Sequence, residues 1–197
     1  VARNLEPYRG FHIFMRALER IQKEHRTCHA VIVGGDSVSY GRQPPTRNCW
    51  REYMLDEVRI DGSRTHFVGK IPYEQYLSVM GISATHVYLT YPFVLSWSIL
   101  EFASMGCQIV ASNTAPVREM ADIGRRPILV DFFETEKIKS ACIERIAQPH
   151  QPIERHHANA GVPTIRTGKY LYEKLVMTTS THEIGSHDQA QRCTKQF

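Results

Sequence analysis

One carboxylate, Glu101, follows a strand-to-helix turn whose first helical residues are suited to holding an anion. Ser96 and Ser98 precede it and can cap the helix, and the exposed N–H groups at a helix start favour phosphate. Glu101 comes a little under one turn after Ser98, where its carboxylate could accept hydrogen bonds from a sugar diol. This spacing predicts a phosphate site beside a carboxylate that binds hydroxyl groups.

The segments on either side of this turn are typical of a parallel sheet. The run THVYLTY, 85–91, is short, β-branched and aromatic, as buried parallel strands are. Pro92 ends it, a helix follows through Glu101 to Met105, and Gly106 is placed to stop that helix. The run QIVAS after the helix predicts a second buried strand.

Strand-like and helix-like segments alternate along most of the chain. Repeated units of this kind imply right-handed crossovers and a doubly wound parallel sheet with helices on both faces, a Rossmann-like α/β fold. Ligands of such sheets bind at the carboxyl ends of the strands. Strands are expected at 29–35, 65–69, 85–91, 108–112 and 127–131, and helices at 8–25, 48–60, 73–81, 96–105, 117–121 and 134–147.

The alternating pattern loosens after Gln148. A further helix is expected near 169–177, and the polar segment 178–197 is expected to be an irregular, mobile tail. The predicted organisation is therefore one ligand-binding domain over 1–177, followed by that tail.

Length and composition restrict the class of protein. The 197 residues are enough for a substantial core, and the 24 basic and 20 acidic residues are mixed along the chain, which favours neither nucleic acid nor a membrane as partner. The five scattered cysteines, without metal-type spacing, are typical of a reducing compartment. Because no membrane-length apolar run and no signal segment is found, we expect a cytoplasmic protein with at most peripheral membrane association.

The sequence lacks the residue patterns of other common kinds of catalytic site. There is no Asp-x-Asp pair, no His-x-x-x-His or Cys/His cluster, no Gly-x-Ser-x-Gly elbow and no glycine-rich phosphate loop of either common type. We therefore expect neither a metal nor a cofactor. Positive side chains and a helix start would have to neutralise a bound diphosphate.

The segment LEFASMGCQIVAS, 100–112, resembles the donor-site signature of glycosyltransferase family 4, which contains two glutamates with seven residues between them. In that family the second glutamate holds the ribose of a nucleotide sugar, and residue matching gives this role to Glu101. The first glutamate touches the donor sugar, and Phe93 stands at its position here. The resemblance implies a GT-B glycosyltransferase that retains the configuration of the transferred sugar.

The N-terminal segment VARNLEPYRGFHIFMRAL, 1–18, carries a second part of the resemblance. It is similar to the family segment in which an arginine and a lysine clamp the donor diphosphate, and Arg3 and Arg9 fall on those two positions. Arginine in place of lysine keeps the charge and can bind a phosphate group through two nitrogen atoms.

The segment HFVGKIPYEQYLSVM, 66–80, resembles the loop that runs under the nucleotide base in the family. Gly69 lets the backbone approach the base, and Lys70 and Ile71 would supply main-chain contacts. Trp97 is either a lid over the donor or a core anchor. The nucleotide-sugar site implied by the resemblance consists of Arg3, Arg9, Gly69, Lys70, Ile71, Ser96, Trp97, Ser98 and Glu101, with no catalytic residue assigned.

The resemblance covers about 1–147, which corresponds to the donor-binding half of a two-domain enzyme. It implies a hexosyltransferase of carbohydrate biosynthesis that uses a UDP- or GDP-sugar, with the absent N-terminal acceptor domain as partner, so that this chain alone is expected not to transfer sugar. Two alternatives stay open. One is a binding or scaffold domain without transfer activity, which Phe93 favours, and the other is an enzyme similar to a nucleotide-sugar epimerase.

Overall fold

The computed structural model describes residues 1–91, 95–120 and 127–148, in which strands and helices alternate as the sequence predicts. The predicted helix at 169–177, the predicted tail at 178–197 and Phe93 lie outside these residues. The strands are β1 (Ala30–Val33), β2 (Thr65–Gly69), β3 (His86–Tyr88), β4 (Ile109–Ser112) and β5 (Ile128–Val130). The helices are α1 (Phe11–Glu24), α2 (Trp50–Glu57), α3 (Tyr73–Ile82), α4 (Trp97–Ser104), α5 (Ala115–Met120) and α6 (Thr135–Ala147), with short 3-10 turns η1 (Pro7–Arg9) and η2 (Gly62–Arg64).

The strand pairings are parallel, which confirms the predicted α/β class. Among the described residues, however, the strands form two sheets, in the orders β1-β2 and β3-β4-β5, where the alternation alone suggests one continuous sheet. The N-terminal segment lies beside β1 on the edge opposite β2, with one parallel bridge between Asn4 and Gly35. It pairs only near the end of β1, and so it does not join the two sheets.

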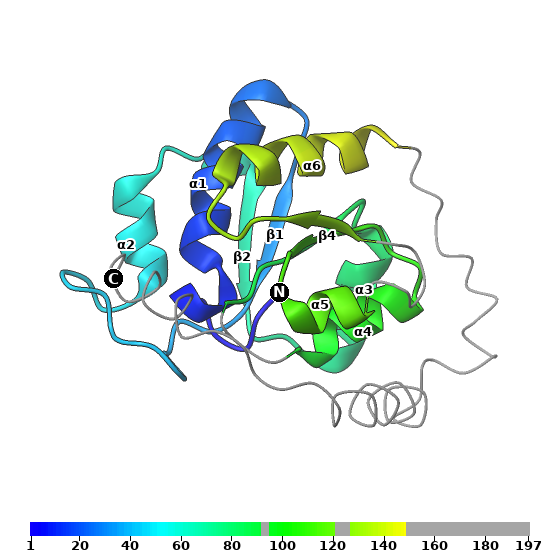
Figure 1. The fold of residues 1–197 in the computed structure, drawn as a ribbon. Helices are drawn as coiled ribbons and strands as arrows, with labels where there is room; N and C mark the ends of the chain where they lie inside the picture. The colour runs from blue at the N-terminus through cyan, green and yellow to red at the C-terminus, as the bar shows by residue number, and fades with distance from the viewer. Residues whose placement is uncertain (92–94, 121–126, 149–197) are drawn as a thin grey trace.

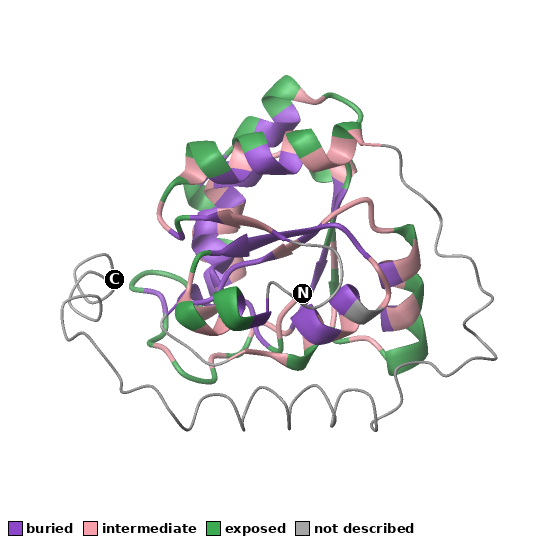
Figure 2. Ribbon diagram, turned by 45° about the vertical axis from the view of Figure 1, so that its right-hand side comes forward, coloured by how far each residue is buried: buried purple, intermediate pink, exposed green. Residues whose placement is uncertain are grey.

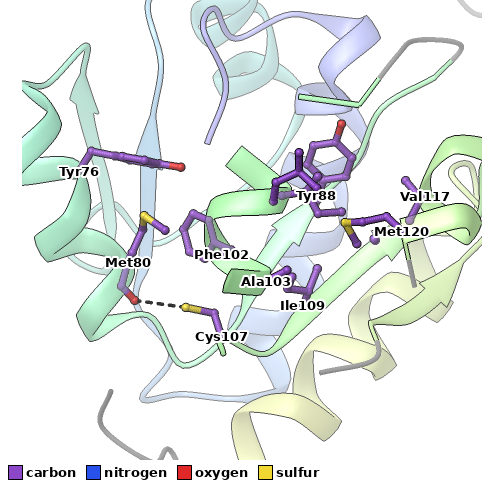
Figure 3. Close-up of a cluster of buried hydrophobic side chains, with 12 residues drawn as sticks. Tyr76, Met80, Tyr88, Phe102, Ala103, Cys107, Ile109, Val117 and Met120 are labelled. Carbon is purple, nitrogen blue, oxygen red and sulfur yellow. Dashed lines mark hydrogen bonds between the residues drawn. The ribbon is translucent and has the colours of Figure 1, made fainter. Parts of the chain in front are cut away.

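Helices cover both faces of the β3-β4-β5 sheet, as Figure 1 shows. Successive side chains of β4 point to opposite faces of the sheet and so belong to two parts of the core. Val110 packs with α1 and α6, whereas Ile109 and Ala111 pack with α3, α4 and α5. Figure 2 shows the buried sides of these helices turned toward the strands. The cluster around α3 and α4 is drawn in Figure 3, where the Cys107 thiol donates to the carbonyl oxygen of Met80.

The first helix has the apolar stripe that its sequence predicts. Phe11, Met15 and Leu18 pack against β1 and α2, while Ile13 and Ile21 pack with β4 and α6. Complete burial of such side chains is worth about 1.5–3 kcal/mol each. The helix begins after Gly10, whose φ is 68° and where a Cβ atom would overlap Leu89. This close approach holds the start of α1 against the end of β3.

Candidate functional site

Glycine turns follow both β1 and β2, and because these strands are parallel the two turns lie together at the carboxyl ends of the strands. Gly35 donates its N–H to the carbonyl oxygen of Arg3 at 3.1 Å. A Cβ atom at Gly35 would lie 2.5 Å from Cε of Lys70 and 2.8 Å from Oδ1 of Asn4. A side chain at position 35 would therefore displace the end of the Lys70 side chain, which crosses the end of β1 here.

Arg9 follows on η1, with its guanidinium 5.8 Å from the centre of the Tyr40 ring. The loop that carries Tyr40 is fixed by Glu6, a carboxylate that is only 1% exposed. Its Oε2 accepts backbone N–H groups from Ser39, Tyr40 and Gly41 at 3.1, 3.0 and 3.3 Å. Glu6 thus positions the aromatic partner of Arg9. This role of Glu6 is not predictable from the local sequence, because its partner loop lies more than thirty residues away.

The start of α4 lies at the end of β3, as predicted, but its two serines do not cap it. Ser96 occupies the N-cap position without a side-chain cap bond. Its Oγ lies 2.8 Å from Oγ of Ser98, and its N–H donates to the hydroxyl of Tyr88 at 2.9 Å. The prediction of serine capping is therefore wrong, because the two hydroxyls bond to each other. The amide-rich helix start remains suited to an anion.

Trp97, the first residue of α4, is 55% exposed. This exposure excludes the core-anchor alternative. The side chain lines the same cavity as Ser96 and Ser98, so the lid alternative remains a prediction.

Glu101 lies one turn into α4 and is held by two tyrosine hydroxyls from α3. Tyr76 donates to its Oε2 at 2.8 Å, and Tyr73 donates to its Oε1 at 3.4 Å. Burial raises the pKa of Tyr76, and the negative charge of Glu101 raises it further. Both tyrosines come just after the Gly69 turn at helical spacing, which is a signal that the sequence analysis did not use. The carboxylate is therefore oriented before any ligand arrives.

The structure brings part of the predicted residues together. A cavity of about 770 Å³ is lined by Arg3, Arg9, Ser96, Trp97 and Ser98. Gly69, Lys70, Ile71 and Glu101 do not line this cavity. Ile71 packs instead with the α3 and α4 cluster, which includes Tyr76, a partner of Glu101. Chemically, the residues that line the cavity can hold an anion, and Glu101 can bind hydroxyl groups.

Among the residues that the structure describes, no three His, Cys, Asp or Glu side chains gather in a way that could hold a metal ion. The same residues contain no helix that is both long and apolar enough to cross a membrane.

A family model described as Glycosyl transferases group 1 matches residues 1–148. No curated protein matches the chain. Solved structures with a similar fold include trehalose-6-phosphate synthase from Burkholderia multivorans, at 12% identity and a TM-score of 0.58. The match covers 93% of this chain and 44% of the synthase chain. A UDP-forming trehalose-phosphate synthase from Burkholderia vietnamiensis shares 13% identity with a TM-score of 0.59, over 91% of this chain and 44% of its own.

An E. coli structure titled as trehalose-6-phosphate bound with UDP-2-fluoro glucose shares 9% identity with a TM-score of 0.59 and covers 87% of this chain and 42% of its own. At these identities the likeness shows the fold, that of GT-B glycosyltransferase Rossmann-like domains. The chain spans less than half the length of these structures.

Proposed function

The chain belongs to the group 1 glycosyl transferases, and from this premise we propose that it binds the nucleotide diphosphate sugar in an enzyme that transfers the sugar to an acceptor hydroxyl with retention of configuration. The observation that carries the proposal is that Arg3, Arg9 and the first residues of α4 line one cavity, to which the carboxyl ends of β1 and β3 also contribute. Parallel α/β sheets bind their ligands at this edge.

In this proposal the positive groups stabilise the diphosphate as it leaves the sugar. Negative charge grows on the leaving oxygen when the bond to the sugar breaks, and fixed donors aimed at that charge lower the barrier. Arg3 and Arg9 provide guanidinium groups, which match phosphate geometry. The amides at the start of α4 add donors and the positive end of the helix dipole. These groups allow neutralisation of the diphosphate without a metal.

Glu101 would accept the ribose hydroxyls. The Tyr73 bond of 3.4 Å is long, so that a ribose hydroxyl could replace it at Oε1. The shorter Tyr76 bond would stay and keep the carboxylate oriented. The base would lie over the backbone of Gly69, Lys70 and Ile71, where main-chain groups read its edge.

UDP is the first nucleotide to test, because two of the similar structures are named as UDP-forming or as bound with a UDP-sugar. Family membership favours a transferase over an epimerase-like enzyme. A donor-binding domain without transfer activity is the second candidate, since Phe93 stands where the family has its first glutamate.

Calorimetric titration with UDP of the chain and of two arginine variants tests the proposal. Arg9→Gln should weaken UDP binding by about tenfold to a hundredfold, because a charge-assisted phosphate contact is lost. Arg26→Gln is the matched control, since Arg26 is exposed and precedes β1 at the opposite end of the strands. Equal effects of the two substitutions, with both variants folded, would place the anion site elsewhere.

A further inference from the structure

The segment from Arg3 to Arg9 carries more than the two arginines of the proposed diphosphate site. Between them lie two buried polar side chains that the proposed function does not use, Asn4 and Glu6, which are 4% and 1% exposed. Both bind the loop 38–42, which follows β1. The same short segment therefore supplies the arginines and holds a neighbouring loop.

The loop 38–42 is fixed along its whole length. Oε2 of Glu6 accepts the backbone N–H groups of the consecutive residues 39–41. At the end of the loop, the indole N–H of Trp50 donates to the carbonyl oxygen of Arg42 at 2.9 Å. A loop whose backbone is bound at successive residues has little freedom to move, so the side chains that it carries are also placed.

The charge of Glu6 makes this attachment stronger than a neutral side chain would. Removing a carboxylate from water is costly unless hydrogen bonds compensate for the lost hydration. The hydrogen bonds that the structure gives to this carboxylate come from residues 39–41. Hydrogen bonds to a charged acceptor are roughly twice as strong as neutral ones. Movement of the loop would leave a buried charge without these donors, and so Glu6 and the loop hold each other in place.

Tyr40 connects this loop to Arg9. Its N–H donates to Glu6, its side chain is 50% exposed, and the guanidinium carbon of Arg9 lies over its ring. A planar guanidinium can stack on an aromatic face and still present N–H groups at its edge to a phosphate, which an ammonium group cannot do in the same way. The ring therefore restricts the orientation of the Arg9 side chain before a ligand binds.

We propose that Glu6 is a positioning residue of the diphosphate site. Its carboxylate fixes the loop 38–42, the loop fixes the ring of Tyr40, and the ring holds the guanidinium of Arg9 in the orientation that binds phosphate. This role of Glu6 rests on the proposed function, in which Arg9 contacts the diphosphate, and Glu6 itself does not touch the ligand. Because the side-chain freedom of Arg9 is already reduced in the free protein, less of it is lost when the nucleotide binds.

A double-mutant cycle, measured by calorimetric titration with UDP, tests this connection. Glu6→Gln keeps the shape but replaces charge-assisted hydrogen bonds by neutral ones, and it should weaken UDP binding by about threefold to tenfold. In an Arg9→Gln chain the same substitution should change the affinity by less than about twofold, because the side chain that Glu6 positions is gone. Tyr40→Leu should also weaken UDP binding, and Tyr40→Phe should recover the affinity because it keeps the ring.

Amide hydrogen exchange measures the loop without a ligand. The N–H groups of residues 39–41 should exchange about tenfold faster, or more, in Glu6→Gln than in the unaltered chain. Asp61→Asn is the matched control, because this carboxylate also accepts a backbone N–H, that of Ser63 at 2.9 Å, but precedes β2 at the opposite end of the strands. It should change neither the exchange at 39–41 nor the affinity for UDP.

Unchanged exchange at 39–41 in folded Glu6→Gln would overturn the positioning role, whatever the chain binds. An equal loss of UDP affinity on Glu6→Gln with and without the Arg9 guanidinium would also overturn it, while leaving the proposed function intact. A chain that binds no UDP would contradict the proposed function and this role with it. If Glu6→Gln does not fold, the cycle of Tyr40→Leu with Arg9→Gln takes its place, since Tyr40 is half exposed, and additive losses there would overturn the role.

Discussion

Glu101 is the residue on which the proposed ribose contact depends, and its two tyrosine partners fix what a substitution there should do. Glu101→Gln keeps the shape but exchanges charge-assisted hydrogen bonds for neutral ones. UDP binding should weaken by about 1.5–3 kcal/mol, or roughly tenfold to a hundredfold. The loss should be smaller for 2′-deoxy-UDP, which lacks one of the two hydroxyls. Calorimetric titration of both nucleotides measures the difference.

Tyr73→Phe is the matched control for this prediction. Its hydroxyl makes the longer bond to Glu101, and the residue is exposed, so its removal should change UDP affinity by no more than about 0.5 kcal/mol. If folded Glu101→Gln binds both nucleotides as the unaltered chain does, Glu101 does not contact ribose.

His12 is a buried residue whose titration should appear in the stability of the fold. It is 3% exposed on α1, 6.1 Å from the Phe132 ring. Burial, and to a smaller extent the charge of Arg16, lower its pKa from 6.5 to about 3. Between these values the unfolded chain binds a proton that the folded chain does not, so stability falls as the pH falls. The cost from pH 6.5 to 5 is about 2 kcal/mol.

His12→Leu should therefore remove the part of the pH dependence that His12 contributes, as measured by denaturant unfolding at pH 6.5 and 5. Burial also lowers the pKa of His86 well below 6.5, so a slope of the same sign remains in the variant. A His12→Leu chain that loses as much stability as the unaltered chain would show that His12 is not buried in its neutral form.

At the scale of elements, local patterns predicted the strands and helices well. Helix α4 was predicted because an apolar strand precedes it and Gly106, with a φ of 71°, terminates it. Side-chain partners from distant elements were not predictable in this way. Periodicity places Glu101 on α4, but it does not reveal that Tyr73 and Tyr76 of α3 point at it. The same limit applies to Glu6 and its loop.

Strand pairing was the other feature that local patterns could not predict. An apolar run indicates a buried strand but does not name its neighbours. The division of the described strands into two sheets is seen only in the three-dimensional arrangement, where Asn4 pairs with Gly35 beyond the end of β1. The domain boundary at 177 stays a prediction, because the described residues end at 148.

The start of α4 also determines how binding should respond to metal removal. If Arg3, Arg9 and the α4 amides neutralise the diphosphate, UDP affinity should be largely unchanged after addition of EDTA. The measurement compares titrations of UDP with and without the chelator in the same buffer. A loss of more than about tenfold, near 1.4 kcal/mol, would indicate a metal bridge to the diphosphate.

At the scale of the whole molecule, the length of the chain limits the expected affinity. The chain corresponds to 44% of the Burkholderia multivorans trehalose-6-phosphate synthase to which its fold is similar. One wall of a cleft buries only part of a ligand, so we expect dissociation constants of about 0.01 to 1 mM, or roughly −4 to −7 kcal/mol. We also expect no sugar transfer by this chain alone, because one wall of a cleft does not hold the acceptor against the donor.

The proposed function requires that this fold binds a nucleotide diphosphate at the carboxyl ends of its strands. Calorimetric titration of the chain with UDP, GDP, ADP and their sugar conjugates measures this binding. We predict saturable binding of at least one diphosphate within the range of about 0.01 to 1 mM, which Arg9→Gln weakens and Arg26→Gln does not. If a folded chain binds none of these nucleotides at millimolar concentration, the proposed function is contradicted.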